Sequence, residues 1–498
     1  MAPQFPPAIL NPEIKYRQLF INNQFVPAKD GTTFSVESPI TGEEICQVSR
    51  AKKADVDAAV AAAKKAYSPG SEWRTMNPKT RALYLNKLAD LIDRDRHYIA
   101  SLESLDCGRH YVTILAGDIQ MCIETLRYFA GWCDKDHGKT IPYDKDHFCF
   151  TRHEPMGVCG AITPWNVPMI IFFWKLAPCL ATGNVLVAKP SELTPLTALY
   201  VASLVKEAGF PPGVVNVIPG YGMEAGEALS RHMDVNKIAF TGSGVTGRKI
   251  QIAAAESNLK RVSLELGGKS PNIIFSDVNL DYAIQMAHTA IFSNNGQVCC
   301  AGSRTFVHED IYDEFVKRSV KRAQEGQMGD PREFATEHGP QVSKVQKDKI
   351  LGLLQSGKDQ GATVLCGGGS VEDRKGYYVQ PTVLTNLKDD MTVSKEEIFG
   401  PVQQIYKFKD VSEVIERANN TAYGLAAAVF TNDINKAMEI ANSVEAGTVW
   451  VNCFFDMNPT APFGGYKASG IGRDLSEYAL REYTQVKVVT IKLNTPSL

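Results

Sequence analysis

The feature that most constrains this sequence is a run of short apolar segments alternating with helical stretches between residues 157 and 266. The apolar segments read VCGAIT, NVLVAKP, VVNVIP, KIAF and RVSLEL. Strands that are apolar on both faces are typical of a parallel sheet covered by helices on both sides. The pattern therefore predicts an α/β domain of the nucleotide-binding type.

A second series of the same kind follows Gly267 and Gly268. It contains the segments NIIF, RTFVH and YVQPTVL, with helices predicted over residues 279–292 and from Asp310 onward. Because 498 residues are too many for one ordinary hydrophobic core, we expect a second α/β domain rather than a continuation of the first sheet.

The two ends of the chain follow other patterns. Residues 15–50 alternate apolar and polar side chains between turn signals, which predicts antiparallel hairpins. Apolar residues at helical spacing predict helices over residues 54–67, 78–106 and 112–136. The tail TQVKVVTIKL alternates like a strand with no strand close by in sequence, so another element or subunit must cover it.

Composition favours a soluble globular protein and argues against two classes of partner. The chain is 44% hydrophobic and 22% charged, with a formal net charge of −2. Nucleic acids and anionic membranes favour a basic face, and this chain offers none, so we expect neither partner. The N-terminal segment lacks an apolar signal core and an Arg-rich presequence, and we expect a cytosolic protein.

One long apolar segment, residues 155–188, resembles a membrane span at first sight, because Lys175 is its only charge. Three prolines and Gly183 divide it into pieces shorter than the roughly 20 residues that a span needs. We therefore predict a buried strand–helix–strand unit.

The eleven cysteines do not form a disulfide framework, since their number is odd and most lie in apolar or helical stretches. They are typical of small buried side chains in a reducing compartment. The sequence has no CxxC pair and no HExxH, so we expect no metal site.

Residues 242–247 read GSGVTG, a formal GxGxxG between a strand and a helix. Glycines there would let a phosphate approach the amides at the helix N-terminus. A simple strand–helix turn explains the motif equally well. A literal Rossmann interpretation would also assign Glu265, about 20 residues further on, to the adenosine ribose.

Lys189 and Glu192 directly follow the apolar strand NVLVA. The carboxyl end of such a strand is the usual ligand edge of a doubly wound sheet. Glu192 could accept both ribose hydroxyls and would repel a 2′-phosphate, which favours NAD over NADP. A solvated loop with a helix cap at Thr194 is the alternative, and the spacing does not separate the two.

Cys299 and Cys300 lie in the Gly/Asn-rich loop NNGQVCCAG. Two adjacent residues cannot both face the same core from one strand. A cysteine in an irregular loop has backbone amides nearby that can hold an oxyanion, which makes one of the two a candidate nucleophile. A buried structural thiol is the competing interpretation.

Glu265 stands between two leucines and is followed by Gly267 and Gly268. Burial would raise its pKa toward the value that a general base needs near neutral pH. The alternative, a glutamate facing solvent from an edge strand, fits the apolar flanks less well.

Asn166 lies between Pro164 and Pro168 in the segment PWNVP. A side-chain amide held rigidly there could stabilise a developing oxyanion. On this segment alone, an ordinary Asn turn before a helix that begins at Pro168 is favoured.

Taken together, these five segments resemble the aldehyde dehydrogenase superfamily, and most closely its class 1 (cytosolic and retinal) and class 2 (mitochondrial) enzymes. The likeness extends over nearly the whole chain and depends on the order and spacing of the segments. Further ones are YFAGWCDKDHGKTIP, ELGGKSPNIIF, KEEIFGPV, GTVWVNC and PFGGYKASGIGR.

The resemblance implies the catalytic roles. Cys299 becomes the nucleophile, as the Cys of G-Q-x-C, and Glu265 becomes the general base, which replaces its literal Rossmann assignment. Asn166 and the backbone N–H of Cys299 become the oxyanion donors. The implied reaction is NAD-dependent oxidation of an aldehyde to a carboxylate through a thiohemiacetal and a thioester.

The resemblance also implies the binding residues. Lys189 and Glu192 would hold the adenosine ribose, Ser243 the pyrophosphate, and Glu397 and Phe399 the nicotinamide ribose and ring. The cofactor residues are completed by Gly242, Trp165 and Gln346. The predicted substrate tunnel is apolar and favours an apolar aldehyde, with retinal as one candidate. The residues that line this tunnel are Val167, Trp174, Val298, Cys300, Met457 and Phe463.

The implied architecture is a Rossmann-like NAD-binding domain (1–137 and 156–266), a second α/β catalytic domain (267–475) and a small β oligomerisation element (138–155 and 476–498). The chain is expected to form a homo-oligomer, a tetramer or a dimer, in which the small sheet pairs across subunits.

Three positions depart from the family's usual residues. Gly244 replaces the Thr after F-T-G-S, which adds backbone freedom beside the pyrophosphate. Val167 replaces a Phe, which should widen the tunnel, and Cys107 replaces an Asn. Gly244 and the altered tunnel leave one alternative open: a structural, crystallin-type homologue with weak or no activity.

Overall fold

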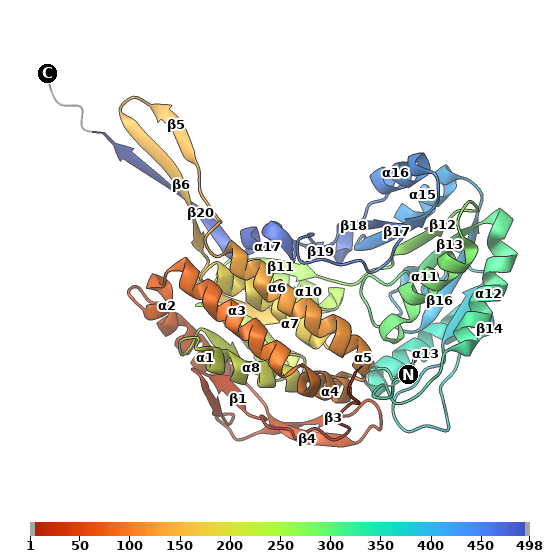
Figure 1. The fold of residues 1–498 in the computed structure, drawn as a ribbon, viewed down its shortest axis with the longest axis horizontal. Coiled ribbons are helices and arrows are strands. Elements are labelled where there is room, and N and C mark those ends of the chain that lie inside the picture. The colour runs from red at the N-terminus through yellow and green to blue at the C-terminus, as the bar shows by residue number, and fades with distance from the viewer. Residues whose placement is uncertain (1–4, 494–498) are drawn as a thin grey trace.

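The computed structural model describes residues 5–493, which form two large, mainly parallel sheets, a small sheet that projects from the body, and a separate two-stranded sheet (Figure 1). The first sheet has the order β19-β11-β10-β7-β8-β9-β1-β2. Its five central strands are parallel and its edges antiparallel. The strands are β1 Leu19–Ile21, β2 Gln24–Val26, β7 Val158–Ile162, β8 Val185–Lys189, β9 Val215–Val217, β10 Lys237–Thr241, β11 Arg261–Glu265 and β19 Gly470–Ile471.

The strand order places helices on both faces of this sheet. The chain passes from β7 to β8 to β9 in one direction, returns to β10 on the other side of β7, and continues to β11. Since parallel crossovers are right-handed, helices of the two runs lie on opposite faces. The first run contains α7 Pro168–Ala181 and α8 Leu196–Ala208, and the second contains α9 Glu227–Arg231 and α10 Gly244–Glu256. The order reverses between β7 and β10, where ligands bind in sheets of this kind.

The second sheet has the order β14-β15-β16-β13-β12-β17-β18 and is parallel except for the edge pair β14/β15. Its strands are β12 Pro271–Ile274, β13 Arg304–His308, β14 Thr363–Cys366, β15 Thr382–Thr385, β16 Val402–Phe408, β17 Ala426–Phe430 and β18 Thr448–Val451. The associated helices are α11 Leu280–Phe292, α12 Tyr312–Glu325, α13 Lys344–Asp359, α14 Thr392–Lys395, α15 Val411–Asn419 and α16 Ile434–Ser443. Two parallel α/β units were expected, and the structure confirms them.

The remaining helices surround the first sheet, and two expected helices are interrupted. The stretch expected to be helical over 78–106 breaks at Asp95, and that over 112–136 contains a π-helical turn, Ile114–Asp118. Asn77 begins the first of these by accepting a hydrogen bond from the N–H of Lys79 at 2.9 Å. These helices are α1 Lys53–Ala66, α2 Glu72–Thr75, α3 Pro78–Arg94, α4 Arg96–Cys107, α5 Tyr111–Thr113, α6 Ile119–Trp132 and α17 Ser476–Tyr483.

The apolar segment 155–188 folds as predicted into a strand, a helix and a strand. The helix, α7, has 14 residues and is buried at every position except Ile170. Among the residues that the structure describes, no helix is both long and apolar enough to cross a membrane. This segment therefore forms the centre of the first core.

The C-terminal strand has a partner within its own chain. β20 Thr484–Lys492 pairs antiparallel with β6 His147–Pro155 along its whole length, and β6 pairs with β5 Thr140–Asp144. This three-stranded sheet extends away from the body (Figure 1). The other hairpin, β3 Thr33–Glu37 with β4 Glu44–Ser49, completes the antiparallel pattern expected over residues 15–50.

The predicted domain limits stay a prediction. The element β19 lies in the range assigned to the second domain, yet it pairs with β11 of the first sheet. Similarly, α17 lies in the range assigned to the oligomerisation element, but Ala479, Leu480 and Tyr483 belong to the first core. Residues 1–4 and 494–498 of the predicted domains lie outside the described residues.

A buried ion pair joins α7 to the segment that follows β19. Lys175 is 0% exposed, and its ammonium contacts the carboxylate of Asp474, which is 3% exposed. Two such charges are tolerated in a core only because each compensates the other.

We predict that Lys175→Met lowers the free energy of unfolding by about 3–5 kcal/mol, because it leaves the Asp474 carboxylate buried without a partner. Urea denaturation followed by circular dichroism measures the change. The matched control is Lys64→Met, whose ion pair with Asp234 is largely exposed and should contribute less than about 1 kcal/mol. Equal effects of the two substitutions would contradict the prediction.

Candidate active site

A cavity of about 880 Å³ opens at the carboxyl ends of the first sheet's strands and extends to the loops of the second unit. It is lined by residues 164–167 after β7, 241–243 at the end of β10 and 265–267 at the end of β11. The first two segments flank the point where the strand order reverses. The second unit contributes residues 293–295 and 298–300, together with Phe455, Met457 and Phe463. The position is the one that the fold predicts for a ligand.

The loop that carries Cys299 is wound tightly after α11. Asn294, Asn295 and Gly296 have φ angles of 50°, 55° and 75°, and Asn and Gly are the residue types that adopt this left-handed conformation most readily. A Cβ at Gly296 would lie 1.9 Å from the carbonyl oxygen of Gly400. The loop is therefore specified by its own sequence and by its close contact with a neighbouring segment.

The two cysteines of this loop differ in exposure. Cys299 is partly exposed and lines the cavity, whereas Cys300 is fully buried beside it. A hydrogen bond with the thiol of Cys299 and burial raise the pKa of Cys300 well above its usual value. A thiol held neutral in this way is a poor nucleophile, so the structure favours Cys299 over Cys300 as the reactive thiol.

Asn166 is buried at the end of the first sheet and reaches the cysteine loop. Its Nδ2 donates to the carbonyl oxygen of Gln297 at 2.9 Å, and the Nδ2 of Asn294 donates to the carbonyl oxygen of Asn166 at 2.9 Å. A side-chain amide has two N–H groups, so the first bond orients Asn166 and leaves one N–H available.

Glu265 ends β11 and lines the same cavity as Cys299. It is 5% exposed, and within residues 5–493 its Oε2 has no hydrogen-bond partner. Burial, and then the nearby charge of Asp474, raise the pKa of Glu265 well above its usual value, against the opposing charge of Lys175. A carboxyl group in this environment is suited to accept a proton near neutral pH.

The residues expected at the nicotinamide end line the same cavity. Glu397 receives a hydrogen bond from the N–H of Gly268 at 3.0 Å, and burial raises the pKa of its carboxyl group to about 7. The ring of Phe399 meets that of Trp165 edge to face at 5.2 Å. Gln346 donates to the carbonyl oxygen of Phe399 at 2.9 Å. All four residues line the cavity.

The residues expected at the adenosine end lie at strand ends, as predicted. Lys189 is the last residue of β8, and its ammonium donates to the carbonyl oxygens of Gly220 and Pro190 and to Glu192. Gly242 and Ser243 line the cavity at the start of α10, where the hydroxyl of Ser243 caps the helix. Lys189 and Glu192 are not among the residues that line the cavity.

The expected tunnel residues also converge. All six line the cavity, and the rings of Trp174 and Phe463 meet at 5.3 Å. Val298 and Met457 pack on the second core near them. The set consists of Val167, Trp174, Val298, Cys300, Met457 and Phe463.

Several residues of the site were not anticipated from the sequence. Phe292 and Phe455 extend the apolar wall, and Lys349 lines the cavity and donates to the carbonyl oxygen of Glu397 at 3.1 Å. Lys175 and Asp474 flank Glu265. A signal for Lys175 existed, since a lone charge in a buried helix requires a buried partner.

Comparison with known proteins identifies the family of this chain. The sequence model of the aldehyde dehydrogenase family matches residues 25–489. The mitochondrial aldehyde dehydrogenase of Homo sapiens is 59% identical over 97% of this chain and 93% of its own length. Retinal dehydrogenase 2 of Homo sapiens is 56% identical over the same shares of the two chains.

Solved structures give the same result. The aldehyde dehydrogenase of Bacillus cereus, described as an NAD+ complex, superposes with a TM-score of 0.95 at 50% identity. The superposition covers 96% of this chain and 97% of that one. The likeness thus includes both α/β units.

These relatives correct one expectation. A cytosolic protein was expected from the N-terminal sequence, but relatives at 58–59% identity from Mesocricetus auratus, Sus scrofa, Homo sapiens and Rattus norvegicus are named mitochondrial aldehyde dehydrogenases. The expectation of a cytosolic protein is therefore not supported by these relatives. The family itself is not in doubt: by sequence along almost its whole length and by the structure of both units, this chain belongs to the aldehyde dehydrogenase family.

Proposed function

We propose that this protein oxidises an apolar aldehyde to its carboxylate with NAD, and that Cys299 is the nucleophile. One observation carries the proposal: a partly exposed thiol, a buried carboxyl group without a hydrogen-bond partner and a fixed side-chain amide line one cavity. Acyl chemistry on a thiol needs this combination of nucleophile, base and oxyanion donor.

The residues present fit a dinucleotide. The start of α10, with Ser243 at its cap, lines the cavity and suits a pyrophosphate. A Cβ at Gly267 would lie 2.3 Å from Oε2 of Glu397, so the glycine makes room for that carboxylate beside the cavity. Glu397 and Phe399 would hold the nicotinamide end, and Lys189 and Glu192 the adenosine ribose. When bound, NAD+ supplies the acceptor for the hydride that the aldehyde carbon loses.

The first half of the reaction uses Cys299 and Asn166. The Cys299 thiolate adds to the aldehyde carbon and forms a tetrahedral adduct whose oxygen carries a negative charge. The free N–H of Asn166 and the backbone N–H of Cys299 stabilise that oxygen, each contributing on the order of 3 kcal/mol. Loss of the hydride restores the carbonyl and leaves a thioester on Cys299.

The second half uses Glu265. Its carboxylate accepts a proton from a water molecule, and the oxygen of that water attacks the thioester carbon. The C–S bond breaks, the electron pair returns to the Cys299 sulfur, and the carboxylate product leaves. Burial without a hydrogen-bond partner keeps the pKa of Glu265 high enough to accept this proton.

The substrate should be apolar and wide. The six predicted tunnel residues are joined by Ile170, Phe292 and Phe455, so the cavity has an extensive apolar lining in addition to polar residues such as Asn166 and Glu265. Val167 contributes a small side chain to this lining. A long or bulky aldehyde, retinal included, is therefore the class that we propose.

We also propose that the three-stranded sheet is the oligomerisation element. It exposes apolar side chains, among them Phe148, Val486 and Val488, and an exposed sheet edge readily pairs with another strand. A homo-oligomer, a dimer or a tetramer, would cover this sheet, with the domain limits as predicted from the sequence.

Cys299→Ala should reduce NADH formation from a panel of aliphatic, aromatic and retinoid aldehydes by about 10³-fold or more, because no other thiol is presented to the cavity in the same way. Cys300→Ala is the matched control and should retain turnover. NADH absorbance measures both. Full activity of Cys299→Ala would exclude Cys299 as the nucleophile. If the unaltered protein shows neither turnover nor NAD binding by calorimetry, the structural, crystallin-type alternative is favoured.

The acid limb of the pH–rate profile should lie above the ordinary carboxyl pKa of about 4. The reason is that Glu265 works deprotonated and its pKa is raised, so the rate falls as pH drops through that raised value. Asp474→Asn removes the charge that raises this pKa and should move the limb to lower pH. Glu265→Gln should remove the limb and lower kcat. A limb that stays in place in Asp474→Asn would contradict the assignment.

Glu192→Gln should raise the ratio of kcat/KM for NADP to that for NAD by at least about tenfold, or about 1.4 kcal/mol. The substitution removes the carboxylate that would repel a 2′-phosphate and accept the ribose hydroxyls. Parallel NADH and NADPH assays on one aldehyde measure the ratio. An unchanged ratio would mean that Glu192 does not discriminate between the two cofactors.

A further inference from the structure

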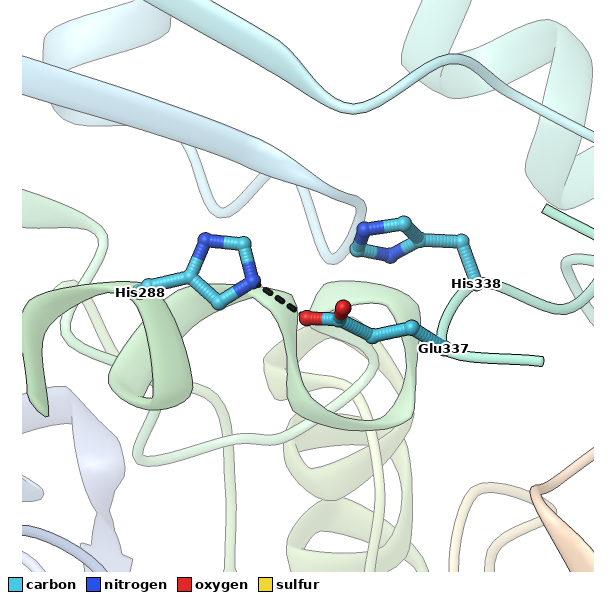
Figure 2. A group of neighbouring side chains, drawn as sticks. All are labelled: His288, Glu337 and His338. Carbon is cyan, nitrogen blue, oxygen red and sulfur yellow. Dashed lines mark hydrogen bonds and ion pairs between the residues drawn. The ribbon is translucent and has the colours of Figure 1, made fainter. Parts of the chain in front are cut away.

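A cluster of two histidines and a glutamate lies beside the proposed active site, and neither proposed half-reaction uses it. His288 projects from α11, while Glu337 and His338 belong to the loop between α12 and α13 (Figure 2). One ligand atom from each residue lies within 4.8 Å of the other two. The three side chains point toward a common centre, with the carboxylate of Glu337 between the two imidazole rings (Figure 2).

His338 is the residue that ordinary packing does not explain. It is 1% exposed, and neither of its ring nitrogens has a hydrogen-bond partner among the described residues. Its backbone is fixed, because its N–H donates to the carbonyl oxygen of Gln327 at 3.0 Å and its own carbonyl accepts from Gly329 at 3.0 Å. A buried polar group without a partner lowers the stability of the fold, so a ligand for this ring would remove that cost.

The other two residues are already close together. His288 is buried, and its Nε2 lies 2.6 Å from Oε1 of Glu337. In a tetrahedral zinc site with bonds of about 2.0–2.2 Å, neighbouring ligand atoms lie about 3.4 Å apart. Small rotations of the three side chains therefore convert the present arrangement into a coordination shell.

We propose that His288, Glu337 and His338 bind one divalent transition-metal ion of the zinc class. Two imidazoles and one carboxylate are the donors that zinc accepts, whereas calcium and magnesium prefer sets of oxygen ligands. His288 and Glu337 also line the cavity, so the fourth ligand would come from its solvent.

One neighbour opposes the cation and provides a test. Arg322 donates to Oε1 and Oε2 of Glu337 at 2.7 and 3.1 Å. The positive charge of Arg322 reduces the affinity of the site for a metal ion. Its shorter hydrogen bond also occupies Oε1 of Glu337, the oxygen that His288 contacts. Removal of this charge should therefore tighten metal binding.

The bound ion would restrict the motion of the loop that carries Cys299. The N–H of Gly339 donates to Oδ1 of Asn295 at 2.8 Å, and the N–H of Val342 donates to Oε1 of Gln297 at 3.0 Å. His288 lies one turn before the end of α11, which leads into the same loop. A metal ion would thus join the two segments that support this loop.

The test uses the full chain with Cys299→Ala, which prevents zinc from binding the exposed thiol, after removal of metals with a chelator. Zinc is then titrated in a calorimeter, and the melting temperature is measured with and without zinc. We expect one equivalent of zinc per chain and a higher melting temperature with the metal. Absence of zinc uptake would overturn the proposal.

Two further substitutions in the same background identify the site. His338→Gln keeps a polar side chain but removes a ligand, and should weaken zinc binding at least tenfold. Arg322→Gln changes a partly exposed side chain and should strengthen it. Unchanged uptake in His338→Gln would overturn the proposal. If that variant fails to fold, Arg322→Gln decides: equal or weaker binding there overturns the assignment.

Discussion

The site depends on how two α/β units are joined around one short loop. The loop belongs to the second unit, yet the amide of Asn166, at the end of the first sheet, donates to its Gln297 carbonyl, and Asn294 returns a hydrogen bond to the backbone of Asn166. Buried amides form such bonds only when both partners are in place, because an unpaired one is costly. The position of Cys299 relative to the first sheet is therefore fixed by the interface itself.

The same interface determines the electrostatics of the cavity. Glu265 ends a strand of the first sheet, and the buried pair of Lys175 and Asp474 is close enough for its charges to act on this carboxyl group. Asp474 raises the pKa of Glu265, while Lys175 opposes this effect. The pair thus both connects α7 to the segment after β19 and changes the pKa of a neighbouring acid, since charges in a core interact more strongly than charges in water.

The sequence predicted those features that depend on local residue patterns, and it predicted less well those that depend on contacts between distant segments. Apolar strands between helices predicted both parallel sheets, and turn residues predicted the hairpins. The apolar spacing did not mark the breaks at Asp95 and at the π-turn 114–118. Each site motif alone left an alternative open, and only their order along the chain selected one. Lys175 and Asp474, 299 residues apart, could not be paired from sequence.

The histidine cluster is a second feature that the sequence alone could not predict. His288 and Glu337 are 49 residues apart, so no ligand spacing marks them, and the absence of metal motifs in the sequence says nothing about a site assembled by folding. Such a site is recognised instead by a buried polar group whose desolvation is not compensated. Here it is an imidazole with both nitrogens unpartnered, beside a carboxylate and a second imidazole. Glu265 likewise has a buried oxygen without a hydrogen-bond partner. In the proposed reaction this carboxylate accepts a proton from water. Unsatisfied polar groups in an otherwise well-packed fold thus point to the places where a ligand or a reaction completes the structure.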